Sequence, residues 1–159
     1  LNAIHEGTTG IQAMDLLGRK VLRGDGRGLA VLGTRLAATC ARASTCPALA
    51  SHAEPLRDAW AGVARTIDAV RTAEPAHTLD NATSFLSAFG HVVVSWLWLD
   101  MALAAIAARP EGPLEAAYFE GKLSACRYVF ECELPKVQVW LAHTASLSNV
   151  ASGAAEDIF

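Results

Sequence analysis

Hydrophobic residues recur along this chain at the three- and four-residue steps of amphipathic helices, between short stretches that contain glycine or proline. The breaks lie at residues 24–28, 46–47, 74–75 and 109–113. They predict five helices, over residues 10–23, 29–43, 48–72, 79–108 and 114–144. The pattern indicates an all-α fold in which an antiparallel helical bundle follows one preceding helix.

The apolar stripes of these segments form the expected core. In chain order they comprise Ile11, Met14, Leu17 and Val21; Leu32, Leu36 and Thr39; Leu49, Leu56, Trp60, Val63, Ile67 and Val70; and Phe119, Leu123, Cys126, Phe130, Leu134, Val137 and Leu141. Pro135 falls inside the last stripe. Because proline lacks a backbone N–H, we expect a kink there.

The most apolar segment, residues 79–108, is long enough to cross a bilayer, which takes about 20 residues. However, it contains His91 and Asp100, and a carboxylate at the bilayer centre is costly. We therefore expect no membrane span, but the central helix of a soluble bundle. Trp96 and Trp98 point to different sides of this helix, so other helices or a second subunit should cover more than one face.

Asp100 needs a partner in such an apolar helix, and Lys122 or Arg127 on the last helix is the expected one. His91 lies nine residues earlier, which places the two side chains on opposite faces at 100° per residue. A catalytic pair is thereby excluded, and we expect His91 in the core, hydrogen-bonded to the backbone or to a neighbour.

The remaining histidines and the cysteines do not predict a metal site. His52, His77 and His143 show no ligand-like spacing. The four cysteines form two pairs, each six residues apart, which is wider than a zinc motif requires. Buried, reduced thiols of a cytoplasmic protein are the expected state, with a bridge between distant cysteines as the alternative.

The start of the chain carries the most informative chemistry. Thr9 and Gln12 have the spacing of a capping box, so a helix should begin there. Its first turn offers free N–H donors that suit a phosphate or a flavin pyrophosphate, and Gly7 and Gly10 allow close approach of a ligand. Glu6 stands just before it as a candidate base. The simpler alternative is a solvated glutamate before a capped helix.

This opening, IHEGTTGIQAMDLLGRK, resembles the I-Y-E-G-T-x-x-I-Q segment of acyl-CoA dehydrogenases. It is most similar to the branch with an extra C-terminal helical domain, which includes methylmercaptopropionyl-CoA dehydrogenase-like enzymes. Similar stretches follow at residues 82–93, 96–99, 118–125 and 134–135. His5 departs from the usual tyrosine, a change that could alter the polarity of the pocket.

The resemblance implies a role for each residue of the opening. Glu6 would be the base that removes the α-proton of an acyl-CoA, while FAD takes a hydride from the β-carbon. The Glu6 N–H would polarise the thioester carbonyl, and Gly7 would line the acyl chain. The residues implied to contact the cofactor are Thr8, Thr9, Gly10 and Gln12.

The resemblance also implies an organisation and partners. Residues 1–26 would end the catalytic C-terminal helical domain, and residues 27–159 would be the appended bundle. The parent protein, the longer enzyme of which this chain would be a piece, would pass electrons to electron-transfer flavoprotein or a similar acceptor and would form a homo-oligomer. Because the other walls of the site are missing here, the isolated chain should be inactive and free of FAD.

Composition agrees with a folded helical protein. The 159 residues are 52% hydrophobic, and the net charge of −3 with scattered basic residues disfavours nucleic-acid binding. The chain has no initiator methionine and no signal-peptide pattern, so we expect a piece of a longer protein. The alternative function is a non-catalytic packing or oligomerisation module, or an alkylation-response relative of the same superfamily.

Overall fold

The computed structural model describes residues 8–74, 77–150 and 153. Its elements are α2 (Thr9–Met14), the π-helix η1 (Asp15–Leu22), α3 (Arg27–Ser44), α4 (Ala50–Arg71), α5 (Ala82–Ala107), α6 (Pro113–Tyr128), the π-helical segment η2 (Val129–Glu133) and α7 (Lys136–Ala145). The described residues contain no strand, and the predicted all-α antiparallel bundle is confirmed.

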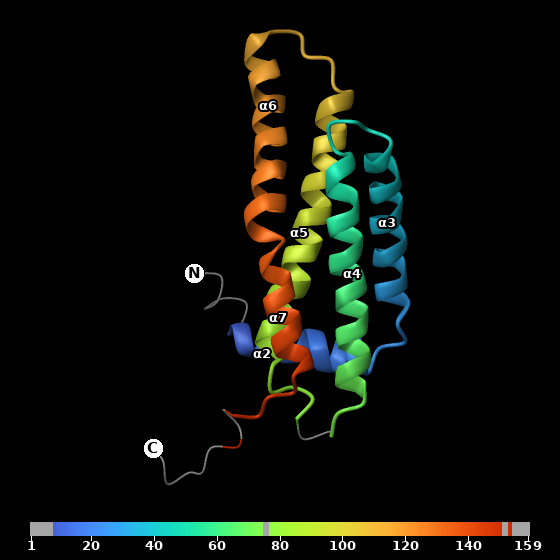
Figure 1. Ribbon diagram of the computed structural model, residues 1–159, viewed down its shortest axis with the longest axis vertical. Coiled ribbons are helices and arrows are strands. Elements are labelled where there is room, and N and C mark those ends of the chain that lie inside the picture. Colours follow the sequence, from blue (N-terminus) through green and yellow to red (C-terminus); the bar gives the residue numbers. More distant parts are fainter. Residues whose placement is uncertain (1–7, 75–76, 151–152, 154–159) are drawn as a thin grey trace.

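The bundle is built from α3, α4, α5 and the pair α6 and α7 (Figure 1). These helices run alternately up and down the long axis, while α2 and η1 lie across the lower end. The helix α5 contacts each of the other bundle helices and also α2. Its central place explains why its sequence is apolar on nearly every side.

The core lies along the bundle axis. Its largest fully buried side chains include Leu17, Leu36, Leu56, Val63, Phe85, Val92, Leu99 and Val137. The predicted stripes of α3, α4 and α7 supply much of this set. On α6 the stripe is only partly enclosed, since Phe119 and Leu123 are half-buried beside the buried Cys126.

The predicted stripe of the first helix is half wrong. Ile11 and Met14 are 57% and 47% exposed, whereas Ala13, Leu17 and Val21 are buried. The buried residues follow one another at four-residue steps, which places them on one side of the segment, and Ile11 and Met14 lie off that side. The segment therefore docks on the bundle through 13, 17 and 21.

The predicted capping box is also displaced. The residue before the first turn of α2 is Thr8, in extended conformation, and its side chain makes no capping hydrogen bond within the described part of the chain. Instead its carbonyl accepts the N–H of Gln12 at 3.1 Å. Thr9 already lies inside the helix.

The expected last helix, residues 114–144, is divided in two. The Leu134 N–H bonds to the Val129 carbonyl, five residues back, at 2.8 Å, and this widened turn precedes Pro135. The proline ring cannot pack against the preceding turn of a regular α-helix, and the π-helical turn makes room for it. A break at Pro135 is confirmed, and Figure 1 shows the ribbon narrow between α6 and α7.

The expected partner of Asp100 is wrong. Arg42 on α3, not Lys122 or Arg127, lies 2.9 Å from this carboxylate. Trp98, two residues away and therefore on another side of α5, faces α6, where Lys122 lies over its ring at 5.6 Å. The carboxylate thus points to α3, out of reach of the α6 cations.

The hydrogen bond predicted for His91 is confirmed. Its Nδ1 lies 2.8 Å from the Ser87 carbonyl, and its Nε2 lies 3.4 Å from Glu133. The residue is half-buried rather than in the core, because α7 covers only one side of it through Trp140.

By length and composition, α5 qualifies as a helix that could cross a membrane. In this structure α3, α4, α6 and α7 pack around it. The absence of a span stays a prediction.

The predicted boundary after residue 26 also stays a prediction, since Ala13 and Leu17 share one core with the bundle.

Candidate functional site

The residues with the strongest predicted chemistry are Glu6 and Gly7, and both lie outside the described residues. The predicted cofactor contacts that follow are described. Thr8, Thr9, Gly10 and Gln12 occupy the start of α2, and all are exposed. At Gly10, an added Cβ would meet nothing within 4 Å. The start of α2 is therefore an open surface of this chain.

The opposite side of the same segment is fixed. Ala13, Leu17 and Val21 are buried against the bundle, while Ile11 and Met14 stay exposed on α2. Such an arrangement holds the start of α2 in place from one side. The exposed side is available to another polypeptide, which would have to supply the rest of any binding pocket.

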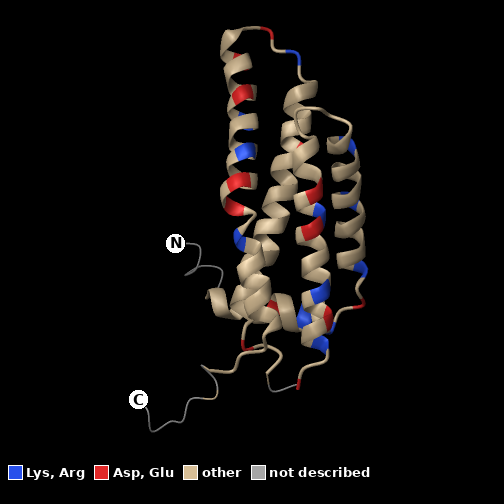
Figure 2. Cartoon of the chain, viewed as in Figure 1, with Lys and Arg blue, Asp and Glu red and all other residues tan. Residues whose placement is uncertain are grey.

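Beside this segment lies a cleft of about 380 Å³, between η1 and the end of α4. Its lining residues are Gly18, Leu22, Arg23, Arg71, Ala73, Thr78 and Leu79. Figure 2 shows Lys and Arg gathered at this end of the bundle, with acidic residues among them. Arg71 lies 3.8 Å from Asp68, a long ion pair that leaves its guanidinium donors available. Arg23 and Arg71 could together hold an anionic group such as a phosphate.

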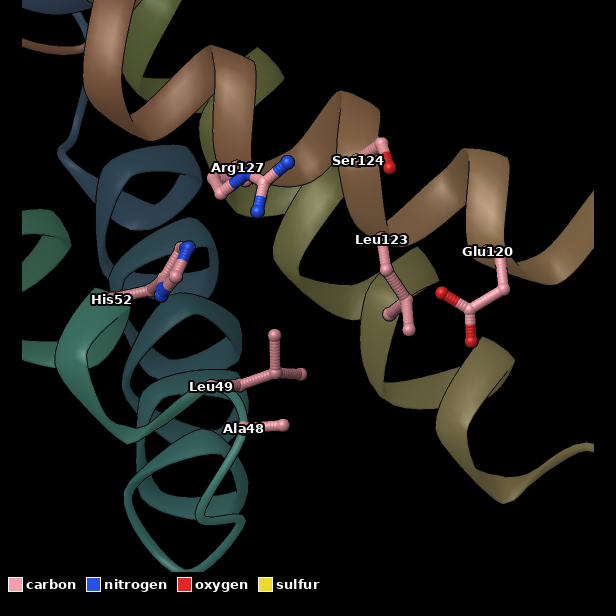
Figure 3. Close-up of a pocket in the computed structure, with 7 residues that line it drawn as sticks. All are labelled: Ala48, Leu49, His52, Glu120, Leu123, Ser124 and Arg127. Atoms are coloured by element: carbon pink, nitrogen blue, oxygen red, sulfur yellow. The ribbon is translucent and has the colours of Figure 1, made fainter.

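A second cleft, of about 200 Å³, lies where the start of α4 meets α6 (Figure 3). Its lining residues are Ala48, Leu49, His52, Glu120, Leu123, Ser124 and Arg127. The side chains of His52 and Arg127 point toward one another at one end, and the Glu120 carboxylate lies at the other. Leu49 and Leu123 lie between these two ends.

His52 has an unusual environment in this second cleft. Its ring packs edge-to-face with Phe130, with centroids 4.5 Å apart, and its Nδ1 lies 3.2 Å from the Ser51 hydroxyl. Burial lowers the pKa of His52, although the charge of Glu131 acts in the opposite direction. The imidazole is therefore neutral near pH 7, with one ring nitrogen held by Ser51.

Metal chemistry has no support in the described part of the chain. There, no group of three or more His, Cys, Asp or Glu side chains lies close enough together to hold an ion. All four cysteines are free thiols. Cys40 and Cys126 are buried as expected, whereas Cys46 is half-buried and Cys132 is exposed.

The sequence reasoning missed both clefts. Glu120 and Arg127 are seven residues apart and so share one side of the helix, which was a usable signal. Nothing in the sequence, however, places His52 opposite them. That pairing depends on how the start of α4 crosses α6, which only the packed bundle determines.

Two comparisons with known proteins bear on this arrangement. A family model described as acetyl-CoA dehydrogenase C-terminal like matches residues 32–153, which include most of α3 and all later helices. The chain is also similar to the 3-methylmercaptopropionyl-CoA dehydrogenase of Ruegeria pomeroyi, with 38% identity over 112 residues. That alignment covers 68% of this chain but 18% of the relative, so the chain spans less than a fifth of that protein.

Proposed function

Because the chain belongs to the acetyl-CoA dehydrogenase C-terminal like family, we propose that it is the C-terminal part of an FAD-dependent acyl-CoA dehydrogenase. One observation carries this proposal: the Glu6-Gly7-Thr8 motif comes directly before the helices that lead into the matched bundle. The relative named as a dehydrogenase supports the same class.

In this proposal the parent protein oxidises an acyl-CoA to the 2,3-enoyl-CoA. The Glu6 carboxylate accepts the α-proton, and its backbone N–H binds the thioester oxygen as negative charge develops there. Gly7 leaves room for the acyl chain. The flavin, when bound, accepts the hydride from the β-carbon.

The residues at the start of α2 are suited to contact a cofactor. The rest of the parent protein would supply the other contacts to that cofactor. Thr8, Thr9, Gly10 and Gln12 are exposed, and the first turn of a helix offers N–H donors to an anion. Docking of Leu17 and Val21 on the bundle would hold these groups in place. In this role the bundle positions the segment that carries the base.

By the same resemblance, we propose that the parent is a cytoplasmic homo-oligomer that reduces electron-transfer flavoprotein or a similar acceptor. The isolated chain should neither bind FAD nor turn over substrate. At the start of α2, Thr9 and Gly10 are exposed, so this chain does not by itself enclose a cofactor there.

The test is turnover by the full-length protein. We expect it to purify with bound flavin and to reduce a dye acceptor when an acyl-CoA is added. Glu6→Gln should keep the flavin spectrum but lower the rate by a factor of about 10² to 10⁴, because one essential base is lost. Glu54→Gln, at an exposed position of α4, is the matched control and should leave the rate unchanged. Near-normal turnover by Glu6→Gln would refute the assignment.

The second candidate is a packing or oligomerisation module, or a relative with altered chemistry of the alkylation-response type. It is favoured by the range of the family match, which covers the bundle and leaves the motif outside. In that case the full-length protein would not reduce an acceptor with any acyl-CoA. Flavin retention without turnover would indicate the altered relative, and a colourless protein would indicate the module.

A further inference from the structure

The second cleft holds two opposite charges that do not pair with each other. Glu120 and Arg127 lie seven residues apart on α6, a rise of about 10.5 Å along the helix. Both side chains line the cleft. Within the described part of the chain, neither has a salt bridge or a hydrogen bond, which leaves both charges available to a ligand.

The middle of this cleft is apolar, and at its cationic end the His52 side chain is held by neighbouring residues. Leu49, 4% exposed, and Leu123 lie between the two charges. At the cationic end, His52 is held by an edge-to-face contact with Phe130 and by the Ser51 hydroxyl. If that hydroxyl donates to Nδ1, the imidazole proton is on Nε2 and can be donated to a ligand.

We propose that this cleft binds a small dipolar ligand of the ω-amino carboxylate class. The carboxylate binds the Arg127 guanidinium and the His52 imidazole, and the ammonium group binds the Glu120 carboxylate. The methylene chain lies over Leu49 and Leu123. This site is separate from the proposed acyl-CoA site and does not depend on it.

The size and charge of the cleft select this class over others. A volume of about 200 Å³ is below the range of roughly 300–1,000 Å³ typical of sites for drug-sized ligands, so a nucleotide or a coenzyme A does not fit. A simple anion would be repelled by Glu120 and a simple cation by Arg127. A ligand with both charges, separated by an apolar chain, avoids both penalties.

The experiment is calorimetric titration of the full-length protein with matched probes. The probes are 4-aminobutanoate, 5-aminopentanoate and 6-aminohexanoate, with hexanoate and hexylamine as the single-charge analogues. We expect saturable binding of at least one amino acid probe, and binding of each single-charge analogue to be at least about tenfold weaker, because each charged contact contributes about that factor.

Variants then assign each end of the ligand. Arg127→Gln should weaken binding of the dipolar probe by about tenfold or more and should leave hexylamine binding no weaker. Glu120→Gln should weaken binding of the dipolar probe by a similar factor and should leave hexanoate binding no weaker. Arg109→Gln and Glu111→Gln, both at exposed positions in the α5–α6 connection, are the matched controls and should leave binding of the dipolar probe unchanged.

The proposal is overturned if no dipolar probe binds saturably to the folded wild-type protein. It is equally overturned if the single-charge analogues bind as tightly as the dipolar probes, or if binding survives both cleft variants. Because the probe series is compared on the wild-type protein, the first two of these results do not depend on the folding of any variant.

Discussion

The guanidinium of Arg42 on α3 lies 2.9 Å from the Asp100 carboxylate on α5. The same carboxylate accepts the Thr39 hydroxyl at 3.4 Å, and that hydroxyl in turn accepts the Trp96 indole N–H at 2.9 Å. Four side chains thus form one polar chain across the α3–α5 contact. Its outer end is exposed, while Thr39 at its centre is buried.

The buried and the exposed parts of this polar chain should differ in their effect on stability. Thr39→Val leaves the Trp96 N–H without its acceptor and should lower the free energy of unfolding by about 1–3 kcal/mol. Asp100→Asn removes an exposed ion pair and should cost about 1 kcal/mol or less. Urea unfolding of the two variants checks this order. A larger loss for Asp100→Asn would contradict it.

The error over the Asp100 partner shows where sequence reasoning stops. Helical periodicity correctly required a partner for a carboxylate in an apolar helix, and it correctly separated His91 from Asp100. It could not distinguish α3 from α6 as the neighbouring helix. Both α3 and α6 carry arginine or lysine residues that could pair with Asp100. Which of the two helices lies next to this carboxylate is set by how the helices pack around α5.

Two leucines of α5 provide a direct test of that packing. Leu99 is fully buried, whereas Leu97 is 45% exposed on the outer side of the helix. Leu99→Ala should destabilise the chain by about 2–5 kcal/mol, because it leaves a cavity in the core. Leu97→Ala should change stability by about 0.5 kcal/mol or less if that side is open to solvent. Thermal and urea unfolding of both variants measure the difference. A comparable loss at Leu97 would mean that another surface covers this face in the folded protein.

The helices of the bundle were predictable because their apolar stripes are long and regular, as on α4 from Leu56 to Val70. The first helix was less predictable, because a π-helical turn leaves no clear mark in a short sequence. The Glu6 motif could be found from sequence, since its chemistry lies in consecutive residues. The second cleft could not, because His52 and Arg127 meet only through the crossing of two helices.

The predicted domain boundary can be tested by limited proteolysis of the folded full-length protein. The connection between η1 and α3 contains Gly26 with a φ of +77°, and Arg23 and Arg27 are exposed on either side. Trypsin should therefore cleave first at residues 23–27 and release the bundle as a stable fragment. Mass spectrometry of the early products locates the cut. Protection of this stretch while other sites are cleaved would place the boundary elsewhere.

The cysteines should differ strongly in reactivity. Burial raises the pKa of Cys126 to about 11, and burial also raises the pKa of Cys40. At pH 8 roughly one Cys126 side chain in a thousand is then a thiolate, the form that reacts with iodoacetamide. Cys132 is exposed and should be alkylated within minutes, whereas Cys40 and Cys126 should react only after unfolding in guanidinium. Peptide mapping after timed alkylation measures each site separately. Rapid labelling of Cys126 in the folded protein would show that α6 separates from α5 in solution, which its place in the core does not allow.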